Sequence, residues 1–369
     1  MNFELSEEQV FLCEAAANAL DRVDTVEAAR EALEDASARP DLWETAVAAG
    51  WSGILVAEEQ GGAGLGPLDA MLVAAECGRR LAPVPLLGHL PASTLAEGDL
   101  AAALASGDRR AAWLPAMPPT DHDDRWTVDP ESGMRRDDAP VLDAGKVTGK
   151  VHWVPDAPGA DVFVAIAIEG GTPKAVAIDA SAAGVSVDEA TVYDSTRPLG
   201  HVTLDGAEGS VLAAGVAAIE FAWAVAQGLI AAESLGATEE AQDRSVEYAK
   251  ERHTFGRPIG SYQAIKHALV EIMRLKENAR SLMYYAGWAG ESAPEQFTLA
   301  AHAFRVGAGD ALDFGSRELI SVHGGIGATW EHDAPLFFRK AQLSRRLLGG
   351  HGAATDRVAG VLLAEARQV

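Results

Sequence analysis

Apolar residues recur at helical spacing from the start of the chain to about residue 105, in segments rich in Ala, Leu and Glu. The first segment opens at Ser6, and Gln9 follows three residues later, which is the pattern of a helix capping box. Residues 1–105 are therefore predicted to form an all-α N-terminal domain.

The pattern changes in residues 106–212, where proline, glycine and aspartate become frequent and apolar residues gather in short runs. Glycine-containing turn clusters separate these runs. Several short strands with regular turns predict a small antiparallel β-barrel or sandwich. The clearest predicted strands are 146–153, 161–168, 175–178 and 201–204.

Helical spacing returns in residues 213–369, where long periodic segments predict a C-terminal four-helix bundle. The expected fold is thus an α+β multidomain chain, with a helical domain, a β domain and a helical bundle in that order. The predicted bundle helices are 216–250, 263–289, 297–323 and 333–348.

Composition narrows the possible partners. The formal net charge is −24, whereas binding to nucleic acid or to an anionic membrane requires clustered Lys and Arg. We therefore exclude both as main partners and interpret the acidity as a solubilising surface. An anionic ligand would need a local basic site.

Cysteine usage and the chain start indicate a cytoplasmic protein. Cys13 and Cys77 are too few for a disulfide framework or a zinc site, and both are expected to be buried thiols within helices. The first residues lack the basic and apolar regions of a signal peptide. No run of about 18 apolar residues suggests a membrane span.

A glycine-rich loop at 61–67 precedes a predicted helix. Such a loop can cradle a phosphate at a helix N-terminus. This one lacks the spacing and the lysine of a P-loop, so a helix connector is the favoured interpretation.

Two later motifs indicate a bound ligand more strongly than this loop does. At the end of the first bundle helix, Arg252, Thr254 and Phe255 offer a guanidinium, a hydroxyl and an aromatic face, which suit the pyrophosphate and adenine of a dinucleotide. In the segment 323–327, His-Gly-Gly-Ile-Gly, the glycines would let backbone N–H groups approach a phosphate. A helix-ending turn would explain one of these glycines, but not three.

Together these motifs resemble the acyl-CoA dehydrogenase family. Residues 50–66 resemble its N-terminal "PEE.GG.G" segment, and 147–153 resemble the strand that leads to its flavin-side tryptophan. Residues 251–258, Gln263 and 323–327 resemble its flavin-contacting bundle motifs. The resemblance implies the three-part fold of that family, FAD as cofactor, and α,β-dehydrogenation of an acyl-CoA thioester.

The catalytic base of the family is missing. Many members place a glutamate in a "YEG" segment after the last helix, and that position is Leu348; other branches supply it from the first bundle helix, where the position is Ala226. Neither side chain accepts a proton. Glu233 and Glu220 are the possible substitutes on the same helix. Glu233 points within about 20° of the direction of Ala226 but about 10 Å further along the axis, and Glu220 points about 120° away.

The elements that would hold the flavin ring of this chain are also altered. The region 114–121 lacks the family's "TEP…GSD" loop. Trp153 is kept, but Pro155 replaces the threonine two residues later and has no donor group. Gly350 and Gly352 replace a threonine and a glutamine of the family.

The residues that reach across the dimer to a neighbour's FAD in the family are retained, apart from one usual glutamine that is now Ser321. This asymmetry predicts a non-catalytic subunit of a heterotetrameric (α2β2) enzyme, as in some actinobacterial members that act on steroid side-chain thioesters. Its expected partners are a second subunit that carries the catalytic glutamate, an acyl-CoA, and an electron-transfer flavoprotein or similar acceptor. The residues expected to contact the shared FAD are Arg252, Thr254, Phe255, Gln263, Ser321, Gly324, Gly325 and Gly327.

Two rival hypotheses remain: a self-sufficient dehydrogenase with an unusual base, and a flavin-free scaffold or thioester-binding protein. A metal site is not expected, because the histidine spacing matches no common ligand motif. The histidines concerned are His267, His302, His323, His332 and His351.

Overall fold

A computed structural model describes residues 4–115 and 139–366 of the chain. The N-terminal part is helical, and the predicted capping box is confirmed, since Ser6 and Gln9 each accept a hydrogen bond from the backbone of the other. Short 3₁₀ turns η1 (Ala36–Ala38), η2 (Trp51–Gly53) and η3 (Glu58–Gln60) connect the helices. The helices are α1 (Glu7–Leu20), α2 (Thr25–Glu31), α3 (Trp43–Ala48), α4 (Pro67–Arg79), α5 (Leu86–Ser93) and α6 (Gly98–Ser106).

A single curled sheet follows, in the order β6-β7-β3-β2-β4-β5-β8, with β1 paired to β4. Most pairs are antiparallel, as predicted, but β1 and β2 both run parallel to β4. β3 carries register shifts before Gly149 and before Val154. The strands are β1 (Ala111–Leu114), β2 (Val141–Asp143), β3 (Lys146–Pro155), β4 (Val162–Glu169), β5 (Thr172–Asp179), β6 (Val185–Glu189), β7 (Leu199–Glu208) and β8 (Ser210–Val211).

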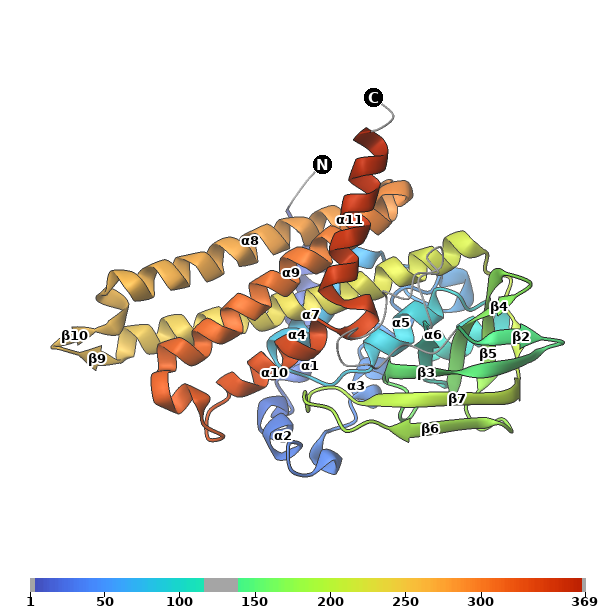
Figure 1. Ribbon diagram of the computed structural model, residues 1–369, viewed down its shortest axis with the longest axis horizontal. Helices are drawn as coiled ribbons and strands as arrows, with labels where there is room; N and C mark the ends of the chain where they lie inside the picture. Colours follow the sequence, from blue (N-terminus) through green and yellow to red (C-terminus); the bar gives the residue numbers. More distant parts are fainter. Residues whose placement is uncertain (1–3, 116–138, 367–369) are drawn as a thin grey trace.

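The C-terminal part is helical and confirms the predicted fold class. Figure 1 shows α7, α8 and α9 side by side along the long axis, with the sheet at one end and the β9–β10 hairpin at the other. The elements are α7 (Val216–Glu251), β9 (His253–Thr254), β10 (Arg257–Pro258), η5 (Ile259–Ser261), α8 (Gln263–Ser292), α9 (Pro294–His323), η6 (Gly324–Ala328), α10 (Ala334–Ser344), η7 (Leu347–Gly349) and α11 (Gly350–Ala366).

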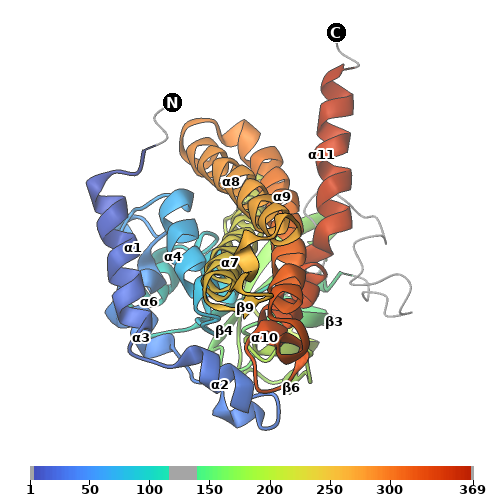
Figure 2. The ribbon, with the colours of Figure 1, turned by 90° about the vertical axis from the view of Figure 1, so that its left-hand side faces the viewer.

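The core centres on α7. Figure 2 shows the N-terminal helices on one side of the bundle and α11 on the other. Gly78 of α4 and Gly236 of α7 let these helices cross closely, because a Cβ at either position would lie 2.0 Å or less from a backbone oxygen of the other helix. Within the described residues α7 has the length and composition of a membrane span, but 72% of its apolar window is buried inside the molecule. α7 is therefore a core helix here.

Two expectations about single elements need correction. The predicted helix 333–348 ends at Ser344, and Leu348, further along, takes a left-handed conformation that an α-helix does not contain. Cys77 is buried as expected, whereas Cys13 is half-buried. In the loop at 61–67, a Cβ on Gly62 would lie 2.1 Å from the carbonyl oxygen of Val56, so close packing requires glycine at this position.

Candidate functional site

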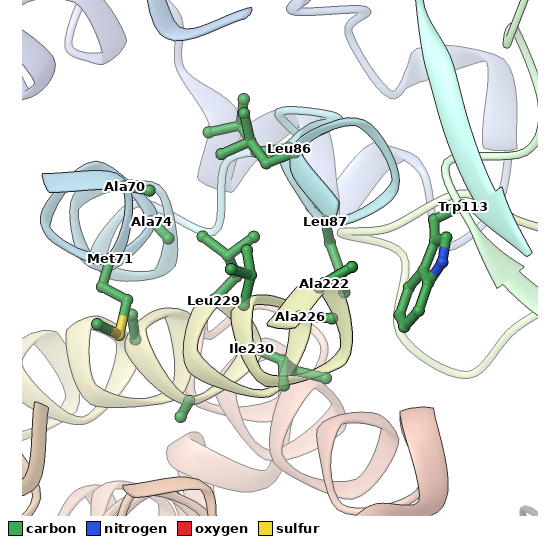
Figure 3. Close-up of a cluster of buried hydrophobic side chains, with 14 of the residues drawn as sticks. Ala70, Met71, Ala74, Leu86, Leu87, Trp113, Ala222, Ala226, Leu229 and Ile230 are labelled. Carbon is green, nitrogen blue, oxygen red and sulfur yellow. The ribbon is translucent and has the colours of Figure 1, made fainter. Parts of the chain in front are cut away.

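Both positions that the resemblance assigns to a base lie in the apolar core. Leu348 in η7 is 3% exposed and Ala226 in α7 is fully buried, and both belong to one hydrophobic cluster. Figure 3 shows Ala226 among other side chains of this cluster, including Leu87 and Trp113. The side chain of Gln227 donates from Nε2 to the carbonyl oxygen of Leu348 at 3.0 Å. These positions therefore provide packing and no proton acceptor.

A buried arginine holds the turn that contains Leu348. Arg305 of α9 is 1% exposed and donates from Nη2 to the carbonyl oxygens of Ser344 and Leu347. These carbonyls belong to the end of α10 and the start of η7, where the helix leaves acceptors without partners. Leu348 then adopts φ 51°, which is uncommon for a side chain of this size.

Because the site of Leu348 is closed, a base introduced there should destabilise the chain. We expect Leu348→Glu to lower the free energy of unfolding by roughly 3 kcal/mol, since the carboxylate would be buried among apolar groups. Urea denaturation measures this, with Leu348→Met as a control that should cost less than about 1.5 kcal/mol. A Leu348→Glu chain as stable as wild type would contradict the buried site.

Glu233, the better-placed substitute base, is held in ion pairs. Its carboxylate accepts hydrogen bonds from Arg197 Nη2 and, at 3.0 Å, from Lys340 Nζ. Burial alone would raise the pKa of Glu233, but the charges of Arg197 and Lys340 lower it to about 2. A carboxylate with so low a pKa, fixed by two cations, is a poor base at neutral pH.

The same cluster extends into the β domain. Asp156 follows β3, lies 3.5 Å from Arg197, and accepts a hydrogen bond from the backbone N–H of Gly88 at 2.8 Å. The four charged residues of this cluster are all buried, and their contacts connect α5, the β domain, α7 and α10. They are Asp156, Arg197, Glu233 and Lys340. Glu220 stands apart: it is half-buried and makes no hydrogen bond or ion pair with the described residues.

Trp153, which the resemblance places beside a flavin ring, contacts His201, a residue that the sequence analysis did not single out. Trp153 has φ 56°, and its backbone N–H donates to His201 Nδ1 at 3.3 Å while the two rings meet edge-on at 4.6 Å. His152 Nδ1 lies 3.0 Å from the same nitrogen, so His152 is the donor there. Burial lowers the pKa of His201, and His152 and Lys150 lower it further. Only the pairing of β3 with β7 reveals this contact.

These contacts leave few free groups for a flavin ring on this side. The Trp153 N–H is already taken, and Pro155, paired with Leu199 of β7, has no N–H. Of the segment 114–121, only Leu114 and Pro115 lie within the described residues, so the missing loop lies almost wholly outside them.

The residues expected to contact a neighbour's FAD lie at the opposite end of the bundle (Figure 1). Arg252, Thr254 and Phe255 form or flank β9 and are exposed, with Phe255 93% exposed at the turn of the hairpin. Gln263 opens α8 and is exposed as well. The Arg252 guanidinium makes no ion pair with any residue in 4–115 or 139–366.

The glycine turn lies at the same end. Gly324 has φ 65° and, like Gly325 and Ser321, is exposed. Gly327 is buried, and close packing requires glycine there, because a Cβ would lie 2.6 Å from the carbonyl oxygen of Ile320. The ends of α7 and α9 meet where the ring of Tyr248 stacks on His323 at 4.2 Å. The two motifs are thus brought to one end of the molecule.

Three of the histidines, His302, His323 and His332, make local contacts. His302 is buried, accepts from Trp223 Nε1 at 3.1 Å and donates to Thr298 O at 2.6 Å, and burial lowers its pKa to about 4. His323 also contacts His332, at 4.2 Å between ring centroids. Within the described part of the chain, no group of three or more His, Cys, Asp or Glu side chains could hold a metal ion.

Comparison with known proteins identifies the family. The model of the acyl-CoA dehydrogenase N-terminal domain matches residues 6–118, and that of the C-terminal domain matches 214–363. The acyl-CoA dehydrogenase IpdE2 of Mycolicibacterium smegmatis is 31% identical over 347 residues, covering 94% of this chain and 96% of IpdE2. This chain belongs to the acyl-CoA dehydrogenase family.

Solved structures agree with this assignment. A variant of the Tcur3481-Tcur3483 steroid ACAD is 28% identical with a TM-score of 0.84, covering 98% of this chain and 99% of that one. The ChsE4-ChsE5 complex from Mycobacterium tuberculosis is 23% identical with a TM-score of 0.82, covering 98% and 99%, and supports the fold. The family acts on acyl-CoA as an oxidoreductase and uses FAD.

Proposed function

We propose that this chain is the non-catalytic subunit of a heterotetrameric FAD-dependent acyl-CoA dehydrogenase. The observation that carries the proposal is that buried Leu348 and Ala226 fill both positions where the family places its base. Glu233, the better substitute, is fixed between Arg197 and Lys340. The proton acceptor would therefore come from a partner subunit of the same family.

The two ends of this chain fit FAD differently. The Trp153 side offers few free donors for a flavin ring, because His201 and Pro155 occupy or remove them. The other end offers the Arg252 guanidinium, the Thr254 hydroxyl and the exposed Phe255 ring, which suit a pyrophosphate and an adenine. Gln263, Ser321, Gly324, Gly325 and Gly327 complete this set.

In the complete enzyme, FAD would supply the acceptor for the hydride that leaves the β-carbon of the thioester. This chain would contribute by holding the charged half of the cofactor: Arg252 would pair with the pyrophosphate, and the backbone N–H of Gly325 would donate to its oxygens, since that of Gly324 already donates to the end of α9. The partner would take the α-proton and enclose the flavin ring.

The proposed substrate is a bulky acyl-CoA thioester of the steroid side-chain type, which the similarity to the Tcur3481-Tcur3483 steroid ACAD supports. Electrons would leave through an electron-transfer flavoprotein or a similar acceptor, and the complex would work in the cytoplasm. Placing the enzyme in steroid or other lipid catabolism follows from that substrate.

Expression of this chain alone and together with its partner tests the proposal. We expect the chain alone to hold little FAD and to dehydrogenate no acyl-CoA, whereas the complex should show flavin absorbance that bleaches when acyl-CoA is added. Full flavin loading and turnover by the chain alone would refute the proposal, and Glu233→Gln and Glu220→Gln would then locate the base. A complex without flavin bands under any pairing would favour a flavin-free scaffold.

A further inference from the structure

The hairpin that carries Arg252 lies in a stretch without carboxylates. In a chain with a net charge of −24, residues 252–270 include Arg252, Arg257 and Lys266 but no Asp or Glu. All three cations are exposed, and none makes an ion pair with a described residue. Figure 1 shows the β9–β10 hairpin at the tip of the molecule, beyond the ends of α7 and α8. Arg252 has a role in the proposed function, whereas Arg257 has none.

The hairpin places Arg257 on the same face as Arg252 and Thr254. Thr254 pairs directly with Arg257, and the backbone N–H of Ile259 donates to the carbonyl oxygen of Arg252 at 2.7 Å, so the ribbon extends as far as Arg252. Side chains alternate between the two faces along each strand, and directly paired residues share a face. Arg252 and Arg257 are therefore diagonal neighbours across the ribbon, at a separation that long side chains can bridge.

The turn of the hairpin maintains this register. Its two central residues, Phe255 and Gly256, have φ of 49° and 79°. A left-handed conformation at both positions is that of a type I′ turn, whose twist matches that of the two strands it joins. Because turn type and loop length determine the register of a hairpin, Thr254 is held opposite Arg257.

Tyr262 holds the Arg257 side chain in place. The Arg257 guanidinium lies 4.0 Å from the centre of the Tyr262 ring, and the Tyr262 hydroxyl donates to the carbonyl oxygen of Thr254 at 3.0 Å. Tyr262 immediately precedes α8, so its side chain connects the start of that helix to β9. A guanidinium that stacks on an aromatic ring still presents the N–H groups at its edge to an anion.

A pyrophosphate offers more charge than Arg252 alone can match. Each of its phosphates carries a negative charge at neutral pH, and one guanidinium pairs bidentately with one phosphate. Arg257 presents a second guanidinium on the face that carries Arg252. Lys266 lies off the ribbon, in the first turn of α8, where its backbone N–H donates to the carbonyl oxygen of Tyr262 at 3.1 Å.

We propose that Arg257 is a second pyrophosphate-binding residue, so that Arg252 and Arg257 each pair with one phosphate of the shared FAD, and that Tyr262 positions Arg257. The inference rests on the proposed function and deepens it, because it assigns the second phosphate to a residue of this chain. A flavin with a single phosphate, FMN, would engage only one of the two arginines.

The affinity of the assembled enzyme for FAD, measured by equilibrium dialysis, tests the inference. Arg257→Gln should weaken FAD binding about tenfold, because a hydrogen bond to a charged group is lost. Tyr262→Leu removes the stacked ring and should weaken binding about threefold, whereas Tyr262→Phe keeps the ring and should bind FAD nearly as wild type does. In the Arg257→Gln background Tyr262→Leu should cause no further loss, because the two changes remove the same interaction.

Lys266→Gln is the matched control. It removes an equal charge from the same stretch but from α8, so FAD affinity should change less than about twofold. Equal losses from Lys266→Gln and Arg257→Gln would reduce the effect to general electrostatics and overturn the inference. A loss from Tyr262→Leu that persists in full without Arg257 would show that Tyr262 does not act through Arg257.

The two arginines separate this inference from the proposed function. If Arg252→Gln weakened FAD binding and Arg257→Gln did not, the inference would be overturned and the proposed function would stand. The same conclusion would follow if Arg257→Gln only impaired assembly of the two subunits, because Arg257 would then contact protein. If neither variant changed FAD affinity, both would fail.

Discussion

Glu233→Ala is expected to lower the free energy of unfolding by about 3–5 kcal/mol, because it would leave Arg197 and Lys340 buried without their counter-charge. Both cations are at least 95% buried and contact the Glu233 carboxylate directly. The cluster also connects three parts of the fold, so its loss should weaken their packing together. Urea denaturation at neutral pH measures the change.

Glu239→Ala provides the matched control, because Glu239 lies on the same helix but at its partly exposed surface. It pairs with Arg79 and Arg280. Ion pairs of this kind contribute about 0–1 kcal/mol, so this variant should unfold close to wild type. If both variants lost the same free energy of unfolding, burial of the Glu233 cluster would not account for the effect.

The pH dependence of stability has a defined sign. The pKa of Glu233 is lowered from 4.5 to about 2, so its contribution is complete above about 4.5 and is lost as the pH falls toward 2. Burial raises the pKa of Asp156, against the charge of Arg197, so its contribution changes in the opposite sense and weakens as the pH rises. Glu233→Ala should therefore flatten the acid limb of the stability profile below pH 4.5, and an unchanged limb would contradict this.

The cluster also shows the limit of sequence reasoning. The periodicity of α7 and the spacing of Glu233 from Ala226 could be read directly, and they placed Glu233 on the right helix. Its ion-pair partners could not be predicted from the sequence. Arg197 and Lys340 are 36 and 107 residues away and meet Glu233 only after the sheet and α10 pack on α7. Helical spacing alone left Glu233 as a candidate base, whereas in the folded chain its carboxylate forms buried ion pairs.

Local patterns predicted long elements better than short ones. α8 and α9 were predicted to within a few residues, because many apolar positions at helical spacing define each of them. β1 and β6 were missed. β1 is only four residues long, and the alternation in β6 is limited to Val185 and Val187, which is too short a pattern to stand out. The early end of α10 was missed because Arg305, from α9, takes over the carbonyl oxygens that would continue the helix.

Arg252→Gln in this chain is expected to weaken the retention of FAD by the assembled enzyme about 10- to 100-fold. The exposed guanidinium has no partner among the described residues, and hydrogen bonds to charged groups contribute about 1.5–3 kcal/mol each. The rate per bound FAD should stay unchanged, because in the proposed function the base and the groups around the reacting carbons would belong to the partner. Equilibrium dialysis of FAD and turnover at saturating FAD separate these two effects.

This separation is what distinguishes a subunit that holds the cofactor from one that performs the reaction. Arg274→Gln removes an equal charge from α8, but Arg274 already pairs with Glu271, so its FAD affinity and turnover should both match wild type. If Arg252→Gln lowered turnover even at saturating FAD, the guanidinium would act near the reacting atoms, and this chain would share in catalysis. If it changed neither quantity, the FAD would be held wholly by the partner. Only a loss of affinity that excess FAD restores fits a chain whose base positions are closed by Leu348 and Ala226 and whose free charge lies at the far end of the bundle.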